Sequence, residues 1–400
     1  MALTLSEKAQ KVKPSSTLAI TAKAKELKAS GIDVVGFGAG EPDFDTPDNI
    51  KAEAINAINS GFTKYTPAAG TVELRQAVCD KFKRFNHLDY TPDQIVISNG
   101  GKHSLSNVFF AILNPGDEVI IPSPFWLTYP EIVKFADGVP VFVTGTKENH
   151  YKVTAKMIEE KITDKTKALI LNTPSNPTGM VYSKEELQEI ADLAVKYNFY
   201  VVSDEMYENL TYDGTEHISI ASLSPEIYER TITVCGLAKG YAMTGWRIGY
   251  TGSSKAIAKL MGGIQSHQTS NPNSIAQKAA VEALNGTQET IGVMVKAFDE
   301  RRVYMFNRVN SIDKISCIEP KGAFYCLVDI SKLFGLTAPN GITINTAADF
   351  AKILIENYNV AVIPCEDFGC ADHIRLSYAI SVETIAKGLD RIEKAIKELK

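Results

Sequence analysis

Residues 167–204 read KALILNTPSNPTGMVYSKEELQEIADLAVKYNFYVVSD, and this stretch decides the fold class. It begins and ends with short apolar runs, KALILN and FYVVSD, which do not alternate with polar residues and are therefore predicted to be strands buried on both faces. Residues 183–198 between them have a helical pattern that opens with a capping box, Ser183 followed by Glu186. A strand, a helix and a strand in this order predict a parallel pair, because parallel strands need a long crossover.

Five further apolar runs of the same kind occur along the chain: QIVIS (94–98), EVIIP (118–122), VPVFV (139–143), RTITVC (230–235) and RIGYTG (247–252). All seven runs together predict an α/β fold with a mostly parallel seven-stranded sheet flanked by helices. After about residue 290 the pattern changes to a long charged helix, three strand-like runs and a closing helix. We therefore expect a large domain over residues 46–294, and a small α+β domain formed by residues 1–45 together with residues 295–400.

The composition argues against several classes of protein. With 44% hydrophobic and 22% charged residues, the 400-residue chain has the composition of a globular protein with more than one core. A net charge of −5 argues against nucleic acid and anionic membranes as partners. No segment has 18 consecutive apolar residues, and the first 16 residues lack a signal-peptide core. Six cysteines without a CxxC pair and six histidines without HxH or HxxxH spacing argue against disulfides and a metal site, so we expect a cytoplasmic protein without a metal.

Polar residues follow the predicted strands at the edge where open α/β sheets bind ligands. They are Gly100, Gly101 and Lys102 after QIVIS, Asn176 after KALILN, Asp204 and Tyr207 at the end of FYVVSD, and Lys239 after RTITVC, with Arg247 eight residues beyond. Taken singly, each has an ordinary structural explanation: a glycine turn, a surface cation, a helix cap or a structural hydrogen bond. Together they combine a helix start that suits a phosphate, a countercharge, a buried carboxylate and a lysine whose pKa a neighbouring cation would lower. This set fits pyridoxal phosphate (PLP), which needs an amine for its aldehyde and a carboxylate for its ring nitrogen.

Motifs over nearly the whole chain also carry a family resemblance: KPSSTLAI, GAGEPDFDTP, KYTPAAG, SNGGKHSL, PGDEVIIPSPFWLTYP, NTPSNPTG, VVSDEMYE, AKGYAMTGWRIGY and HIRLSYA. In these motifs the sequence resembles the class I aminotransferases of PLP fold type I, specifically the aspartate aminotransferases of many bacteria. The resemblance implies that Lys239 binds the cofactor covalently and moves the substrate proton, and that Asp204 binds the pyridine nitrogen. It further implies that Tyr207 and Asn176 donate to the phenolic oxygen of the ring, and that Trp126 stacks on the ring.

The same resemblance assigns the phosphate and the subunit contact. Gly100, Gly101, Lys102 and Arg247 match the positions that hold the cofactor phosphate. Tyr65, in KYTPAAG, matches a tyrosine that reaches the phosphate from the neighbouring subunit. The resemblance therefore implies a homodimer with shared active sites.

Substrate recognition is implied in the same way. Arg375, in IRLSYA, matches the arginine that binds the substrate α-carboxylate, and Gly40 matches a glycine close to that carboxylate. The SHQTSNP segment (266–272) lacks the arginine by which animal-type aspartate enzymes bind the side-chain carboxylate. In the bacterial subgroup this role falls to Lys102 with a hydroxyl from Thr17, although Lys102 could equally be a solvated lysine at a helix start.

One further departure concerns Ala238, which stands where many members have a serine that contacts the phosphate. The expected reaction is transfer of the amino group of L-aspartate to 2-oxoglutarate by a ping-pong mechanism. The alternatives are an aminotransferase for prephenate, aromatic amino acids, alanine or kynurenine, and, less favoured, a PLP-dependent carbon–sulfur lyase. The fold leaves the choice among them open, because one scaffold hosts many specificities.

Overall fold

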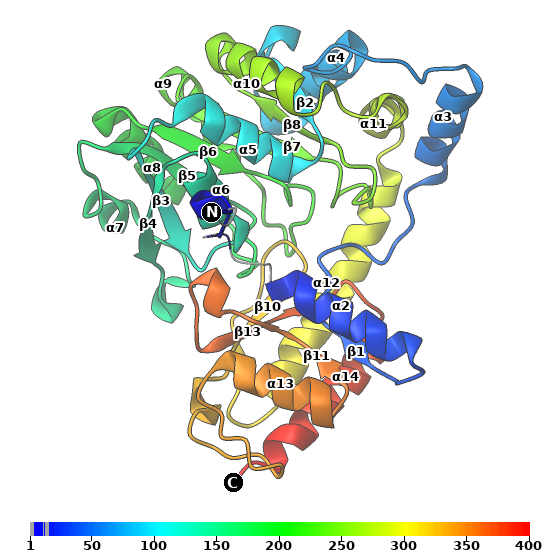
Figure 1. Cartoon of the computed structure of the whole chain (residues 1–400), viewed down its shortest axis with the longest axis vertical. Helices are drawn as coiled ribbons and strands as arrows, with labels where there is room; N and C mark the ends of the chain where they lie inside the picture. Colours follow the sequence, from blue (N-terminus) through cyan, green and yellow to red (C-terminus); the bar gives the residue numbers. More distant parts are fainter. Residues whose placement is uncertain (1–3, 11, 13–15) are drawn as a thin grey trace.

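The computed structural model describes residues 4–10, 12 and 16–400. Residues 13–15 of the KPSSTLAI motif lie outside the described residues. The larger part of the molecule is built on a seven-stranded sheet in the order β2-β8-β7-β6-β5-β3-β4 (Figure 1). The strands are β2 (Ile95–Ser98), β3 (Glu118–Ser123), β4 (Val139–Thr144), β5 (Thr166–Asn172), β6 (Tyr200–Asp204), β7 (Thr231–Gly236) and β8 (Gly249–Gly252). In this sheet only β8 runs in the direction opposite to the other six strands, which confirms the predicted, mostly parallel α/β fold.

Helices cover both faces of this sheet. One face packs against α5 (Gly101–Ile112), α6 (Thr128–Phe135) and α10 (Lys255–Gln268), and the other against α7 (Ala155–Glu159), α8 (Lys184–Tyr197) and α9 (Pro225–Tyr228). Adjacent residues of β5 alternate between the faces: Ile170 belongs to the first core, and Leu169 and Leu171 to the second. The predicted capping box at the start of α8 is present, with Ser183 and Glu186 each bonded to the other's backbone N–H.

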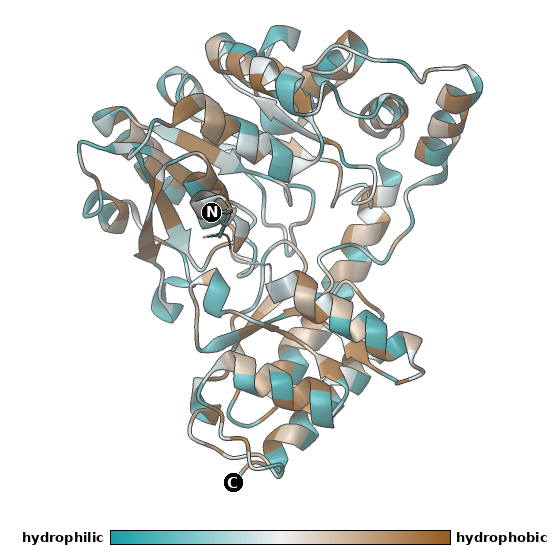
Figure 2. Cartoon of the chain, viewed as in Figure 1, coloured by the Kyte–Doolittle hydropathy of each residue, from teal (hydrophilic) through white to brown (hydrophobic). Residues whose placement is uncertain are grey.

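The prediction that every run is buried on both faces is wrong for VPVFV. This run forms β4, which lies at the edge of the sheet and leaves Val139 and Phe142 each 44% exposed. The other edge strand, β2, is fully buried because α5 and α10 pack against it. β4 packs against the short helix α6, and part of its apolar surface stays in solvent. The hydropathy colouring in Figure 2 shows hydrophobic strands in the large sheet and hydrophilic residues on many outer helical turns.

The far end of the sheet, at β2 and β8, packs against three more helices: α3 (Asp48–Asn59), α4 (Val72–Lys81) and α11 (Ser274–Asn285). A π-helical turn, η1 (Phe82–Asn86), continues α4. The short 3₁₀ turns are η2 (Pro92–Gln94), η3 (Lys147–Asn149), η4 (Ile220–Ser222), η5 (Ser331–Leu333) and η6 (Glu366–Phe368).

The smaller part of the molecule contains an antiparallel sheet in the order β12-β13-β10-β9. Its strands are β9 (Ser316–Cys317), β10 (Tyr325–Asp329), β12 (Ile363–Pro364) and β13 (His373–Ser377), and its core includes residues of α12 (Glu289–Asn310), α13 (Ala347–Asn357) and α14 (Val382–Lys397). One of the three predicted strand-like runs after residue 290, VAVIP (360–364), is divided, because β11 (Val360–Ala361) pairs with β1 (Val35–Gly36) while β12 pairs with β13.

The N-terminal segment lies against this smaller part. After α1 (Glu7–Gln10), α2 (Ser16–Ala29) packs on β11 and β12, and β1 runs parallel to β11. Helix α12 runs between the two parts of the molecule (Figure 1). Its residue Ile291 packs against the core at β2 and β8, whereas Met294 and Phe298 belong to the core of the smaller part. The boundary expected after residue 294 therefore falls within one continuous helix.

None of the helices among the described residues is both long and apolar enough to cross a lipid bilayer.

Candidate active site

A cavity of about 250 Å³ opens at the carboxyl ends of the large-sheet strands, between that sheet, β13 and the start of α2. Of the predicted site residues, Thr17, Gly40, Gly101, Lys102, Trp126, Asn176, Asp204, Tyr207, Lys239, Arg247 and Arg375 line this cavity. Its wall also includes residues that the sequence did not single out, namely Leu18, Leu105, Leu127, Thr128, Tyr129, Asn172, Met206 and Tyr325, besides Ala238. We call this space the central cavity.

Lys239 reaches the central cavity from the loop after β7. Its amine donates a hydrogen bond to the carbonyl oxygen of Gly40, and Nζ lies 5.7 Å from the ring centre of Phe324. Burial, and secondarily the positive charge of Arg375, lowers the pKa of Lys239 to about 8. A substantial fraction of this amine is therefore neutral near physiological pH, as a nucleophile or a proton acceptor must be.

Asp204 ends β6 with its carboxylate held on both oxygens. Oδ2 accepts a hydrogen bond from the Tyr129 hydroxyl at 2.6 Å, and Oδ1 accepts one from the Met206 backbone N–H at 3.2 Å. Burial raises the pKa of Asp204 to about 6, although the Tyr129 bond acts in the opposite direction. A buried carboxylate of this kind is completed by a cationic partner such as a protonated ring nitrogen.

The two expected donors to the phenolic oxygen each contact a residue of the small antiparallel sheet. Asn176 accepts a hydrogen bond from Arg375 Nη1 at 2.9 Å through Oδ1, its acceptor atom, which agrees with the expected role of its amide nitrogen as a donor. Asn172, missed by the sequence reasoning, accepts the backbone N–H of Asn176 at 2.8 Å. The hydroxyls of Tyr207 and Tyr325 lie 2.9 Å apart.

The start of α5 and Arg247 form a candidate anion site. Gly100 has a φ of 86°, and a Cβ built on it would lie 2.4 Å from Arg247 Nη2, so only glycine lets the guanidinium approach this helix start. Arg247 Nη1 donates to the Thr244 carbonyl at 2.8 Å. Backbone N–H groups at a helix start and a guanidinium together suit a phosphate.

Lys102, in the first turn of α5, lies on the other side of this helix start. Its Nζ is 5.0 Å from the ring centre of Trp126, and burial together with the charge of Arg247 lowers its pKa. Thr17, in the first turn of α2, has a buried Oγ1 without a hydrogen-bond partner among the described residues. The structure thus brings this predicted pair into the wall of one cavity.

Arg375 is buried on β13, with only 2% of its surface exposed. Its guanidinium stacks on Tyr325, with Cζ 4.3 Å from the ring centre, and Nη1 donates to Asn176. Nε and Nη2 have no partner within the described part of the chain. Two buried donors without an acceptor are costly, so this edge of the guanidinium suits a ligand carboxylate.

Tyr65 is the predicted site residue that lies apart. It is 90% exposed and lines a separate open depression, together with Thr63, Lys64 and residues 269–274. The part of the SHQTSNP segment from Thr269 onward thus lies beside Tyr65 and not in the wall of the central cavity.

A buried polar network lies behind Asp204, and the sequence reasoning missed it. Lys81 forms an ion pair with Glu208 and donates to Asn86 Oδ1 at 2.9 Å. Asn86 donates to Glu208 at 2.9 Å and to Glu205 at 3.2 Å, and His217 Nε2 lies 2.9 Å from Glu205. The network joins α4 and η1 to the segment that follows β6, and so supports the backbone that carries Asp204.

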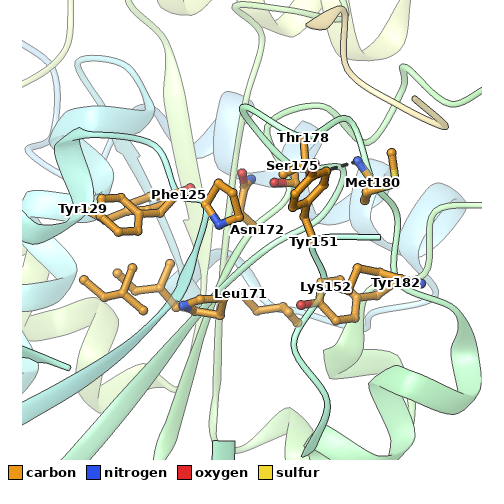
Figure 3. A pocket seen from close by; sticks show the side chains of 14 residues that line it. Phe125, Tyr129, Tyr151, Lys152, Leu171, Asn172, Ser175, Thr178, Met180 and Tyr182 are labelled. Atoms are coloured by element: carbon orange, nitrogen blue, oxygen red, sulfur yellow. Dashed lines mark hydrogen bonds between the residues drawn. The ribbon is translucent and has the colours of Figure 1, made fainter. Parts of the chain in front are cut away.

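A second cavity beneath the first is too small for a substrate. Figure 3 shows its lining, which includes Tyr129, Asn172, Ser175 and Tyr182. Its volume is about 20 Å³, which is room for about one water molecule. Of these two cavities, only the central one has room for a molecule larger than water.

Comparison with known families gives the identity of the fold. The family described as "Aminotransferase class I and II" matches residues 32–392 of the chain. The chain belongs to this family. The aminotransferase is 48% identical over 393 residues to an aspartate aminotransferase of Bacillus sp. (strain YM-2), with 98% of this chain and 99% of the relative covered. It is 48% identical over 391 residues to a probable aspartate/prephenate aminotransferase of Rhizobium leguminosarum bv. phaseoli, with 98% of each chain covered.

A solved structure agrees with these relatives. The aspartate aminotransferase of Thermus thermophilus with maleate superposes on this aminotransferase with a TM-score of 0.92 at 44% identity, covering 98% of this chain and 100% of the other. The fold is therefore PLP fold type I, as the sequence predicted. The cofactor of the family is pyridoxal 5′-phosphate, and the donor set here fits it: an anion site for the phosphate, a carboxylate for the ring nitrogen and an amine for the aldehyde.

Proposed function

We propose that this aminotransferase moves the amino group of L-aspartate to 2-oxoglutarate, giving oxaloacetate and L-glutamate. The observation that carries the proposal is the buried Arg375, whose Nε and Nη2 lack partners among the described residues in the cavity that also holds Lys239 and Lys102. Arg375 and Lys102 are two cations at separate points of one cavity, and together they suit a substrate with two carboxylates. The Bacillus relative named aspartate aminotransferase supports this specificity, and so does the Thermus structure with maleate, a dicarboxylate.

The cofactor would be held by groups that the central cavity already presents. Its phosphate would lie at the start of α5 beside Arg247, its ring between Trp126 and the β6 end, and its ring nitrogen at Asp204. When bound, PLP supplies an electron-accepting ring that makes the hydrogen on the substrate Cα acidic. Ala238 offers the phosphate no hydroxyl, so α5 and Arg247 carry that contact.

The side chains divide the work of the reaction. Arg375 binds the α-carboxylate through its free edge and so fixes the direction of the Cα–H bond. Lys239 Nζ removes the proton from Cα, which its lowered pKa permits. Lys102, assisted by Thr17, binds the second carboxylate, and the amino acid and the 2-oxo acid use the same groups in turn, which gives a ping-pong cycle.

We propose further that two copies of the chain form a homodimer with shared sites. Tyr65 is almost fully exposed and lies outside its own chain's central cavity, as expected of a residue that serves a neighbour. Exposed apolar side chains on α3, α4, α10 and α12 agree with a covered surface: Ile55, Ile58, Val72, Leu260 and Val293. All six cysteines are buried and free of disulfides, which suits a cytoplasmic location.

The division into domains is also part of the proposal. Residues 46–294 would form the large domain, and residues 1–45 with 295–400 the small one. Arg375 and Thr17 reach the cavity from the proposed small domain, whereas Lys239 and Asp204 belong to the proposed large one. Movement of the small domain would therefore bring the substrate-binding groups toward the chemical ones and exclude water.

A second candidate substrate is prephenate. The Rhizobium relative is named a probable aspartate/prephenate aminotransferase, and prephenate also carries a second carboxylate that Lys102 could bind. After reaction with L-aspartate, the same purified protein should then transfer the amino group to prephenate. The absence of such transfer would leave L-aspartate and 2-oxoglutarate as the proposed pair.

The experiment follows the visible absorbance of the PLP-loaded enzyme while L-aspartate is added without an acceptor. The wild type should convert its cofactor to the amino form, and Lys239→Ala should not. Arg375→Lys should need at least about 30-fold more L-aspartate, because a buried carboxylate loses its two-point partner. Lys102→Met should lose the preference for L-aspartate over L-alanine, and an unchanged preference would contradict the assignment of the second carboxylate.

A further inference from the structure

A cluster of four side chains next to the central cavity takes no part in the proposed reaction. His373 Nδ1, at the start of β13, lies 3.0 Å from Cys370 Sγ and 2.7 Å from Asp372 Oδ1. The sulfur and the carboxylate oxygen are 4.0 Å apart, and Tyr151 Oη lies 2.7 Å from Nε2 on the opposite edge of the ring. Cys370 is 9% exposed and His373 5%, so the thiol and the imidazole are buried together.

Without an ion, hydrogen bonds hold the cluster together when Nδ1 carries a proton. The imidazole then donates to Asp372 Oδ1, and the Cys370 thiol donates to the same oxygen. Loss of these two protons would leave a thiolate, an imidazole lone pair and a carboxylate oxygen facing one another. A cation that displaces the two protons would be shared by all three atoms.

We propose that Cys370, Asp372 and His373 bind a divalent transition-metal ion of the Zn²⁺ type. A thiolate, an imidazole and a carboxylate are the ligand types that Zn²⁺ takes in proteins. The three ligand atoms all lie within 4.8 Å of one another. Tetrahedral Zn²⁺ places such ligands roughly 3.3–3.6 Å apart. The two distances from Nδ1 would therefore lengthen by about half an ångström, and the sulfur–oxygen distance would shorten by about as much. The Asp372 side chain, which is 49% exposed, is free to make that movement.

Tyr151 completes the arrangement. With a metal on Nδ1, Nε2 carries the ring proton, and the tyrosine oxygen 2.7 Å away is placed to accept it. The nearby carboxylates of Asp372 and Asp329 make the surroundings of Cys370 negative, which favours a cation. Lys147 neutralises part of this charge, since its Nζ lies 3.0 Å from Asp329.

A second group with metal-ligand residues does not qualify. Glu205, Glu208 and His217 also lie close together. Their carboxylates already accept hydrogen bonds from Lys81 and Asn86, as well as from Ser203 and Ser219, so an internal cation occupies the place of the ion. Within the described part of the chain, no lysine or arginine donates a hydrogen bond to Cys370, Asp372 or His373.

The test uses tag-free, PLP-loaded protein dialysed against a chelator. Calorimetric titration with Zn²⁺ should give one equivalent per chain, and Co²⁺ should give the visible absorption bands of a tetrahedral thiolate site. Cys370→Ser and His373→Gln should each weaken binding at least about 100-fold, and Tyr151→Phe about 10-fold. Asp372→Asn alters a half-exposed side chain, so it tests the same site without disturbing the core.

Cys365→Ser is the matched control, because it removes a buried thiol five residues earlier whose Sγ lies 3.6 Å from the Ile363 carbonyl oxygen. It should leave Zn²⁺ affinity unchanged. The proposal is overturned if the wild type takes up no Zn²⁺, or if Cys370→Ser and Asp372→Asn both bind it as tightly as the wild type does.

Discussion

The hydroxyl of Tyr129 donates to Asp204 Oδ2 across 2.6 Å, and this bond joins α6 to the end of β6. The other oxygen of Asp204 is held by the backbone of Met206. The carboxylate therefore has a fixed orientation before any ligand enters the central cavity. A preoriented carboxylate needs little reorganisation when it meets a positive charge.

Tyr129→Phe should weaken cofactor binding. The lost bond to a charged group is worth about 1.5–3 kcal/mol, which corresponds to roughly 10- to 150-fold in affinity. This bond lowers the pKa of Asp204, so its loss should move that pKa further above about 6. As the pH is lowered, the PLP affinity of the variant should therefore begin to fall at a higher pH than that of the wild type. Tyr90→Phe is the control, since its hydroxyl lies 3.2 Å from Thr233 Oγ1 and does not touch Asp204. Equal PLP affinities for all three proteins would remove Tyr129 from the cofactor site.

Lys239→Met should stabilise the cofactor-free protein in a pH-dependent manner. The pKa of Lys239 is about 8 in the folded chain against 10.5 for an ordinary lysine, so the protonated form costs on the order of 3 kcal/mol on folding. That cost is complete below about pH 8 and disappears as the pH rises toward 10.5. Urea unfolding should therefore show the variant more stable near pH 7, with the difference shrinking near pH 9.5. Lys161→Met, at an exposed position, should show no such trend.

Gly100→Ala should impair phosphate binding more than folding. Its Cβ would lie 2.4 Å from Arg247 Nη2, and its φ of 86° strains any side chain. Gly116→Ala is a matched control, because its φ of 88° is nearly the same and nothing lies within 4 Å of its Cβ. Both variants should lose on the order of 1–3 kcal/mol of stability. Only Gly100→Ala should lose affinity for PLP. If both variants lose PLP affinity to a similar extent, the contact between residue 100 and Arg247 is unimportant for phosphate binding.

Lys81→Met should be among the most destabilising single substitutions. It leaves the carboxylate of Glu208 buried without its ion-pair partner, which typically costs about 3–5 kcal/mol. Lys83→Met breaks an exposed pair with Asp89, N to O distance 3.3 Å, and should cost about 1 kcal/mol or less. The double variant Lys81→Met/Glu208→Gln should recover part of the loss, as measured by urea unfolding. If the two single variants are equally stable, the network does not support the β6 end.

The site residues at the strand ends could be predicted from the sequence, because ligands of open α/β sheets bind at the carboxyl ends of the strands. Asp204 and Lys239 each follow a recognisable apolar run, and the edge to which parallel strands deliver their ends is known beforehand. Arg375 differs, because it lies on an antiparallel strand of another sheet, and only the family resemblance indicated that it faces the same cavity.

Other residues carried no signal that sequence reasoning could use. Lys81 lies in a helix, where a lysine usually indicates a solvated face, yet it is only 1% exposed. Its ion-pair partner Glu208 is 127 positions away, so no local pattern indicates that the lysine is buried. The sequence Cys-x-Asp-His at 370–373 differs from the HxH and HxxxH spacings that usually indicate a metal site. The fourth member of this cluster, Tyr151, contacts His373 from 222 positions away. Long-range pairs of this kind depend on how the elements pack, which no local pattern contains.

The placement of Thr17 on α2 separates substitutions that change substrate preference from substitutions that change the catalytic groups. This helix packs on the small sheet, while the residues proposed to hold the cofactor lie on the large one. Substitutions at Thr17 and its exposed neighbour Leu18, which also lines the cavity, can alter which side chain the enzyme prefers without moving Lys239 or Asp204. A directed-evolution library confined to this one turn would therefore explore new substrates while keeping the catalytic machinery of the parent enzyme.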